Sequence, residues 1–241
     1  MKISDYINFR LGRIPKGYIF TYNDFIVEVS KKDAIIKALN RLAKTNKIVR
    51  LSKGKYYKPE DSVFGSLKPS LEQIVKDLLE KGDKIIGYLT GYSVYNKLGL
   101  TTQVGNTIQI GRNEIRSAFK REYYTISFVK QKNTITKENV PLLQILDAIR
   151  YIKQIPDTTI ENSCKRFLAI VASLSESERN MLVKLSLKYT PATRALTGAI
   201  LDELGMFDLS ESIFKTLNPI TKYKIPEVDK VLSASAKWNI E

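Results

Sequence analysis

The 241-residue sequence is longer than one average domain, and its 43% hydrophobic content is sufficient for ordinary globular cores. It has one cysteine and no histidine, which excludes an internal disulfide and any Ser-His or Cys-His nucleophile pair and argues against a zinc site. The net charge of +14 is unevenly placed: residues 1–60 hold 14 of the 39 Lys and Arg residues but only 5 of the 25 Asp and Glu residues.

This asymmetry predicts a polyanionic partner for the N-terminal quarter of the chain. No apolar run is long enough to cross a bilayer, and MKISDYINF lacks the apolar core of a secretion signal, so we expect a cytoplasmic protein. The glycine-rich phosphate motifs G-x-x-x-x-G-K-[ST] and G-x-G-x-x-G are both absent. Since no closely spaced cluster of Asp and Glu occurs either, we predict no enzymatic activity, no cofactor and no bound metal.

The first element is a predicted helix over residues 3–14, where apolar side chains recur at helical spacing. Pro15 ends it, because the residue before a proline disfavours the α conformation. A short extended piece follows at 18–20.

Two further helices are marked by S/T-x-x-D patterns, in which a hydroxyl caps the helix start and the acid complements the helix dipole. Thr21 with Asp24 predicts a helix at about 22–29, and Ser30 with Asp33 predicts one at about 31–45. Asn46 suits the left-handed position that follows a helix.

The third helix has two faces. Its apolar stripe runs from Ile35 to Leu42, and its opposite side carries Lys37, Arg41 and Lys44. A basic face alone is typical of a solvated surface helix. Here, however, a strand at 48–52 and the returning KGKYY form a basic hairpin, whose Lys53-Gly54 turn suits a glycine at positive φ. Three helices followed by such a hairpin predict a winged helix-turn-helix.

In that motif one helix enters the major groove of DNA and the hairpin lies along the flanking backbone. The adjacent Tyr56 and Tyr57 point to opposite faces of the ribbon, so we expect at least one of them to pack in the core. A basic helix can also lie on anionic lipid, but large exposed apolar residues opposite the charges are missing, and no RNP-like strand or GxxG loop indicates RNA. The candidate DNA-binding residues are Lys31, Lys32, Lys37, Arg41, Lys44, Arg50, Lys53 and Lys55, with Lys58 as a weaker member.

The whole sequence predicts an α+β fold in three parts. They are a winged helix-turn-helix domain at 1–60, a linker with Pro, Gly and Ser at 61–69, and a C-terminal domain at 70–241. The last begins as a mixed α/β segment and becomes a helical bundle from Pro141. We expect helices at about 70–80, 141–152, 160–174, 176–188, 191–204 and 209–217, a short helix in TGYSVYNKLGL, and strands at 85–88, 106–110 and 124–129.

Few residues in this C-terminal part suggest chemistry. Cys164 falls in an apolar helical pattern and is interpreted as core, and the aromatic residues of GYLTGYSVY are interpreted as a packing cluster. A metal site is conceivable at a set of carboxylates, but helix capping and solvation explain them better. They are Glu161, Glu176, Glu178, Asp202 and Glu203.

Several blocks of sequence resemble the AbiEi-like antitoxins of type IV abortive-infection toxin–antitoxin systems, in the branch with an N-terminal winged helix. The matching blocks are ALNRLAKTNKIVRLSKGKYYKP at 38–59, GYLTGYSVYNKLGLTTQV at 87–104, TPATRALTGAILDELG at 190–205, and the terminal LNPITKYKIP and WNIE. The resemblance implies a DNA-binding domain that represses its own operon at operator repeats. Because a single turn-motif unit contacts few base pairs, we expect two copies on an inverted repeat, as a homodimer or as cooperating monomers. It also implies a C-terminal domain that opposes a nucleotidyltransferase-like toxin, for which direct contact need not be assumed.

Two alternatives remain open. One is a winged-helix transcription regulator unrelated to any toxin, which an adjacent nucleotidyltransferase-like gene would argue against. The other is a magnesium-dependent nucleic-acid-processing enzyme, which requires a group of carboxylates to converge in space.

Overall fold

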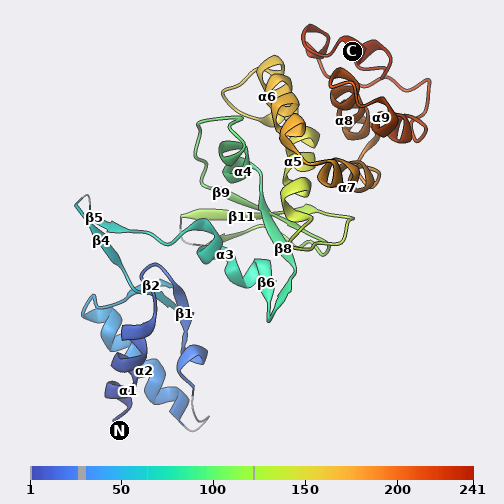
Figure 1. The fold of residues 1–241 in the computed structure, drawn as a ribbon. Helices are drawn as coiled ribbons and strands as arrows, with labels where there is room; N and C mark the ends of the chain where they lie inside the picture. Colours follow the sequence, from blue (N-terminus) through green and yellow to red (C-terminus); the bar gives the residue numbers. More distant parts are fainter. Residues whose placement is uncertain (1, 27–30, 64, 122) are drawn as a thin grey trace. The chain divides into compact units, whose positions relative to one another are not determined.

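The computed structural model describes residues 2–26, 31–63, 65–121 and 123–241, and its fold is mixed α+β (Figure 1). The chain divides into two compact units. Unit 1 comprises residues 1–77 and 121–123, and unit 2 comprises residues 78–120 and 124–241. No helix in the described ranges combines the length and the apolar character needed to cross a membrane.

Unit 1 begins with helix α1 (Ile3–Arg13), strand β1 (Ile19–Thr21), a 3-10 turn η1 (Tyr22–Phe25) and helix α2 (Lys32–Lys44). Strands β2 (Val49–Ser52) and β3 (Lys55–Tyr57) follow as a hairpin, and β1 joins them in an antiparallel sheet of order β1-β3-β2. Gly54 closes the hairpin turn at φ +77°, a conformation that glycine adopts without steric cost, as predicted.

The core of unit 1 forms where α1 and α2 turn their apolar faces toward the sheet. Ile7 and Leu11 of α1 meet Ile35 and Leu39 of α2, and Phe20 of β1 lies between them and the hairpin. The helical spacing of apolar residues predicted both helices, and Asn46 has the expected left-handed backbone (φ 56°).

The prediction of an α-helix at 22–29 was wrong where the structure describes it. The Thr21–Asp24 capping box is present, but it opens a 3-10 turn, and Ile26 is already extended. Phe25 is buried, and the β-branched Ile26 after it favours extended backbone over helix. Residues 27–30, with the rest of that helix and the Ser30 cap, lie outside the described residues.

The segment predicted as a linker at 61–69 is ordered differently. Strands β4 (Glu60–Ser62) and β5 (Gly65–Leu67) pair as an antiparallel hairpin, for which Pro, Gly and Ser are as well suited as for a linker. The following helix α3 (Leu71–Leu79) contributes its first seven residues to unit 1, where Gln73 Oε1 accepts a hydrogen bond from the Ile19 N–H (3.3 Å). The chain therefore divides within α3, at Asp77.

Unit 2 contains a four-stranded sheet of order β10-β11-β9-β8. A small hairpin, β6 (Glu80–Lys81) and β7 (Lys84–Ile85), precedes β8 (Gly87–Thr90) and helix α4 (Tyr92–Lys97). Strands β9 (Thr107–Arg112) and β11 (Tyr124–Lys130) pair in parallel, with β10 (Phe119–Arg121) as the edge strand. Tyr88 and Tyr95 of the GYLTGYSVY block are buried in the main core, which confirms the predicted packing cluster.

The helical part follows the predicted order: α5 (Val140–Arg150), α6 (Ile160–Ser173), α7 (Glu176–Ser186), α8 (Pro191–Glu203) and α9 (Phe207–Phe214). Short 3-10 turns occupy Ile152–Gln154, Val228–Lys230 and Ser233–Ala236. Two helix starts were predicted from their capping residues: Ser175 and Glu178 form a capping box, and Thr190 precedes Pro191 at the start of α8. Helix α9, predicted at 209–217, begins and ends earlier, at Phe207–Phe214.

The block at 190–205 and the two terminal blocks, LNPITKYKIP and WNIE, pack against one another. Tyr223 of LNPITKYKIP exchanges backbone hydrogen bonds with the WNIE end, and Trp238 is fully buried against Phe214 (ring centroids 5.2 Å apart). Gly198 of α8 lies against the Trp238 ring, because a Cβ built there would stand 2.0 Å from a ring carbon. The blocks are thus explained by packing.

We expect Gly198→Ala to lower the free energy of unfolding of unit 2 by about 1–3 kcal/mol, the usual cost of overpacking a close-packed core. Trp238 is the only tryptophan, so its fluorescence during urea titration measures this directly. Gly12→Ala in α1 is the control, because a Cβ there meets no atom within 4 Å. Equal stability of the Gly198 variant and the unmodified protein would contradict the close packing.

Candidate nucleic-acid interface

The basic face of α2 consists of Lys37, Arg41 and Lys44, which are all exposed. At 100° per residue these three side chains lie within an arc of about 60°. The opposite side buries Ile35, Ala38 and Leu39 in the core of unit 1. One face of the helix is therefore fixed by packing. The other presents Lys37, Arg41 and Lys44 to solvent along nearly two turns, after an exposed acid, Asp33, in the first turn.

The hairpin is fastened to the same helix by Tyr56. Its hydroxyl donates a hydrogen bond to Asn40 Oδ1 of α2 (2.6 Å), and its ring stacks on Phe20. Tyr56 and Tyr57 are both buried, at 3% and 8% exposed, so the prediction that at least one packs in the core is confirmed and neither is available to DNA. The basic face and the hairpin consequently belong to one rigid body.

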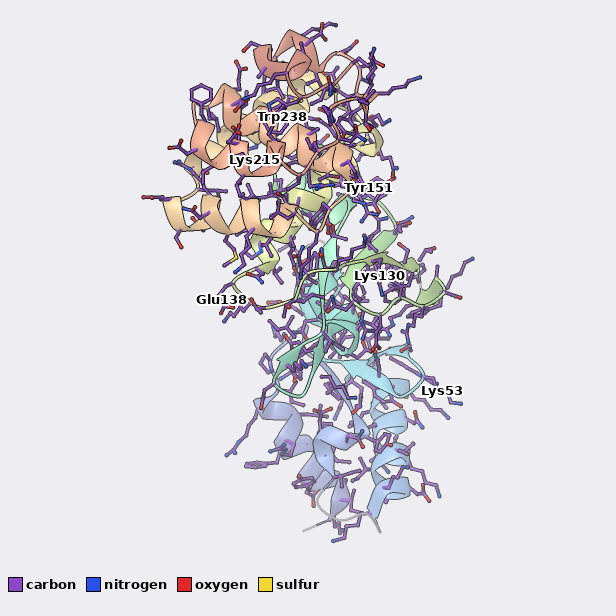
Figure 2. The ribbon with its side chains drawn as sticks, turned by 90° about the vertical axis from the view of Figure 1, so that its right-hand side faces the viewer. Lys53, Lys130, Glu138, Tyr151, Lys215 and Trp238 are labelled. Atoms are coloured by element: carbon purple, nitrogen blue, oxygen red, sulfur yellow. The ribbon has the colours of Figure 1, made fainter. Side chains whose placement is uncertain are left out.

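The structure brings the other predicted residues into this region to different degrees. Lys53 is exposed at the tip of the hairpin (Figure 2), and Arg50 is exposed on β2 with its Nε donating to the Ser52 carbonyl (3.4 Å). Lys58, in contrast, donates to the Leu11 carbonyl at the end of α1 (3.4 Å) and is partly buried.

Lys31 and Lys32 stand at the start of α2, away from the basic face. Lys31 is the N-cap residue, and Lys32 lies about 140° around the helix from Lys37. The Lys32 ammonium is 5.0 Å from the centre of the Tyr22 ring, a cation–π distance that ties it to η1. These two lysines form a second basic position at the helix N-terminus.

Lys55 is the predicted DNA-binding residue whose charge is already paired within unit 1. Its side chain is only 20% exposed, and its ammonium lies 2.8 Å from Asp77 Oδ1. Arg121 holds the same carboxylate through two hydrogen bonds of 2.7 and 3.0 Å. Burial lowers the pKa of Lys55 despite its partner, whereas the hydrogen bonds from Arg121 and Lys55 outweigh burial and hold the pKa of Asp77 below its ordinary value. No sequence pattern indicates this cluster, because its members are far apart in the chain.

Lys53 and Lys55 form a matched pair on one hairpin. We expect Lys53→Ala to weaken duplex DNA binding several-fold and to reduce the slope of log affinity against log salt by about 0.9, the value for one neutralised phosphate. Lys55→Ala removes the same charge from a side chain already engaged by Asp77, so the slope should stay unchanged. Fluorescence anisotropy at several salt concentrations measures both, and equal effects would contradict the assignment.

Four of the five carboxylates considered for metal binding have structural partners, among them Asp202, which pairs with Lys237 (2.6 Å). Glu178 caps α7, Glu161 pairs with Lys165 (2.7 Å), and Glu203 accepts from the Ser233 backbone. Among the residues that the structure describes, no three His, Cys, Asp or Glu side chains are grouped to hold a metal ion. Burial raises the pKa of the Cys164 thiol to about 12, which fits its interpretation as core.

Comparison with known proteins places the chain in a family. The model of DUF6088, described as a family of unknown function, matches residues 6–180. The chain belongs to the DUF6088 family. The DUF6088 match covers the basic face, the hairpin and the sheet of unit 2, and a comparison with curated proteins finds no match.

A solved structure is similar to this DUF6088 protein. It is the crystal structure of the RV2827C protein from Mycobacterium tuberculosis, with a TM-score of 0.62 and 11% sequence identity. The likeness covers 92% of this chain and 83% of that chain. At such low identity it shows a shared fold alone.

A buried polar cluster in unit 2 of this DUF6088 chain was missed at the sequence level. Asp147 of α5 is fully buried and accepts hydrogen bonds from the hydroxyls of Tyr88 (2.7 Å), Thr90 (3.0 Å) and Tyr189 (2.9 Å). Gln131 donates to both tyrosine hydroxyls at 2.8 Å. The sequence carries little signal of it, because Asp147 lies at least about 100° around the predicted helix from the stripe of Leu142, Ile145, Leu146 and Ile149, where an acid is ordinary.

Proposed function

We propose that this DUF6088 protein is a DNA-binding antitoxin and transcriptional autorepressor of a type IV toxin–antitoxin operon. The observation that carries the DNA-binding part is the basic face of α2, held rigidly beside a hairpin with an exposed lysine at its tip. Duplex DNA offers a regular array of phosphates, and several fixed cations on one body can each neutralise one of them.

The order of elements in unit 1 supports a winged helix-turn-helix. A helix, a short strand, a turn, a second amphipathic helix and a hairpin in one small antiparallel sheet match its arrangement, with β2 and β3 as the wing. In this assignment α2 enters the major groove, so Lys37, Arg41 and Lys44 approach bases or phosphates. Lys53 and Arg50 reach the flanking backbone.

A single recognition helix contacts few base pairs, so two copies on an inverted repeat are expected, with half-sites about one helical turn apart. Electrophoretic mobility shift with the DNA upstream of the protein's own gene tests this. Two successive shifted species, or one cooperative species that a half-site does not give, support the proposal. Absence of any preference over random duplex would overturn the autorepressor role.

The antitoxin part rests on the resemblance of the sequence blocks to AbiEi-like antitoxins. Co-expression with a nucleotidyltransferase-like toxin from the same operon should restore growth. Restoration should persist in the variant Lys37→Glu with Arg41→Glu when both genes are driven from foreign promoters, because the C-terminal region is expected to oppose the toxin. Failure of the unmodified protein to restore growth would leave a winged-helix regulator as the better description.

A further inference from the structure

The structure assigns to unit 2 a second anion site: we propose that the pocket at the carboxyl end of β11 binds a small ligand carrying a di- or triphosphate group. The pocket has a volume of about 370 Å³, within the range of small-molecule sites. This site lies wholly in unit 2, and its ligand is independent of DNA binding by unit 1.

The first step is the charge of the pocket wall. Its lining includes five cations and, among the described residues, no carboxylate: Lys130, Lys132, Arg150, Lys188 and Arg194. They come from the end of β11, the end of α5, the α7–α8 connection and the first turn of α8. None of the five makes an ion pair with an acid in the described part of the chain. Like charges gathered from four segments repel one another, so a polyanion would be bound strongly here.

The second step is the set of donors available to an anion. Helix α8 starts at the pocket with Thr190 and Pro191, and its first turn contains no acid, so its dipole favours negative charge there. Arg194 donates a hydrogen bond from Nη1 to the Thr216 carbonyl (3.1 Å), and its buried Nε has no hydrogen-bond partner among the described residues. Arg194 lines the pocket, and guanidinium groups suit phosphate oxygens because their charged N–H donors lie in one plane.

The third step is rigidity. Gln131 and Tyr189 also line the pocket, and their polar groups are held by the Asp147 cluster. Gln131 Oε1 accepts from the Asn133 backbone N–H (2.8 Å), so both ends of this amide are fixed. The ammonium of Lys130, labelled in Figure 2, donates a hydrogen bond to the Asn113 carbonyl. A wall fixed in this way loses little conformational freedom when a ligand binds.

The charge and shape together favour a small polyphosphate. One phosphate would leave most of five cations uncompensated, whereas a di- or triphosphate carries several charges within a pocket of this volume. A duplex, in contrast, presents singly charged phosphates along a convex rod, which a concave pocket contacts poorly.

Isothermal titration calorimetry on the full chain, with inorganic pyrophosphate, a nucleoside triphosphate and the corresponding nucleoside, tests the proposal. We expect both phosphorylated probes to bind and to raise the melting temperature, and the nucleoside alone not to bind. Tighter binding of the nucleoside triphosphate than of pyrophosphate would identify a nucleotide as the ligand. Equal binding of the two would identify a simple phosphate chain.

The test variant is Lys132→Ala with Lys188→Ala, since both lysines are exposed on the pocket wall. We expect its affinity for pyrophosphate to fall by about tenfold or more. The control, Lys137→Ala with Lys184→Ala, removes the same charge from exposed lysines of unit 2 that do not line the pocket, and should bind as the unmodified protein does. The proposal is overturned by absence of binding at millimolar probe, by an equal decrease in the control, or by a pocket variant that loses duplex DNA binding but keeps pyrophosphate binding.

Discussion

Reversing two charges on the basic face, Lys37→Glu with Arg41→Glu, should lower the affinity for operator DNA by more than about 100-fold. Each side chain is exposed on α2 and, in our proposal, faces a phosphate or a base edge. Reversal removes the attraction and adds a repulsion. The salt dependence should weaken as well, by about 0.9 in the log–log slope for each phosphate that the variant no longer neutralises.

A matched control separates this local effect from the change in net charge. Lys137→Glu with Lys184→Glu alters the formal charge by the same amount, but both residues are exposed in unit 2. It should bind operator DNA within a few-fold of the unmodified protein. We expect both variants to fold, since the altered side chains are exposed. Far-ultraviolet circular dichroism checks this. If both double variants lose binding equally, the basic face has no special role and unit 1 attracts DNA only through its total charge.

The elements that the sequence predicted well are those with local causes. Helical spacing of apolar residues located α1 and α2, and the Lys53-Gly54 turn located the hairpin. The α7 start followed from Ser175 and Glu178, which are three residues apart and act on the same helix turn. Each of these signals is decided within a few residues, so tertiary structure had little to override.

The predictions that differ from the structure concern long-range contacts. From its position in the hairpin, Lys55 was expected to contact DNA, but its environment depends on Asp77 and Arg121, which are remote in sequence. The helix expected at 22–29 begins with its capping box, yet the burial of Phe25 and the extended Ile26 end the turn early. The hairpin at 60–67 was missed because its composition equally suits a linker.

The candidate sites differ in the same way. The basic face of α2 is one helix and could be predicted from spacing alone. The anion pocket gathers its five cations from four segments between Lys130 and Arg194, and the pairing of β11 with β9 and the packing of α5 beside β8 bring them together. No local pattern could predict that convergence.

Removal of the Asp147 carboxylate should destabilise unit 2 more than any other single change that we consider. Asp147→Ala leaves the hydroxyls of Tyr88 and Thr90 without the acceptor that they share in the structure. It also removes one acceptor from the Tyr189 hydroxyl, whose remaining acceptor is the Leu143 carbonyl, at a longer distance (3.3 Å). Each buried group left unsatisfied costs about 1–3 kcal/mol, so we expect a loss of about 3–5 kcal/mol in the free energy of unfolding. Urea titration followed by Trp238 fluorescence measures it. A loss below about 1 kcal/mol would show that water or repacking replaces the carboxylate.

The variant Asp147→Asn keeps the volume and one acceptor, and its pH dependence tests the electrostatics of the site. Burial raises the pKa of Asp147 above its ordinary value of 3.8, although the hydrogen bonds from Tyr88, Tyr189 and Thr90 and the charge of Arg150 act in the opposite direction. The unfolded chain therefore releases this proton at lower pH than the folded chain. Stability that protonated Asp147 contributes is complete below the ordinary pKa and is lost as pH rises through the raised folded pKa.

The amide of the Asp147→Asn variant cannot ionise, so the unmodified protein should lose stability relative to that variant as pH rises above about 4. The comparison must be made between the two proteins, because Asp202 acts in the opposite direction: hydrogen bonds from Lys237, Ser210 and Trp238 outweigh its burial and lower its pKa. Asp202 is present in both proteins, and its effect cancels in the difference. A difference that stays constant from about pH 4 to about pH 8 would mean that the three hydroxyls stabilise the ionised carboxylate fully, and that the cluster beneath the anion pocket carries its negative charge at no cost.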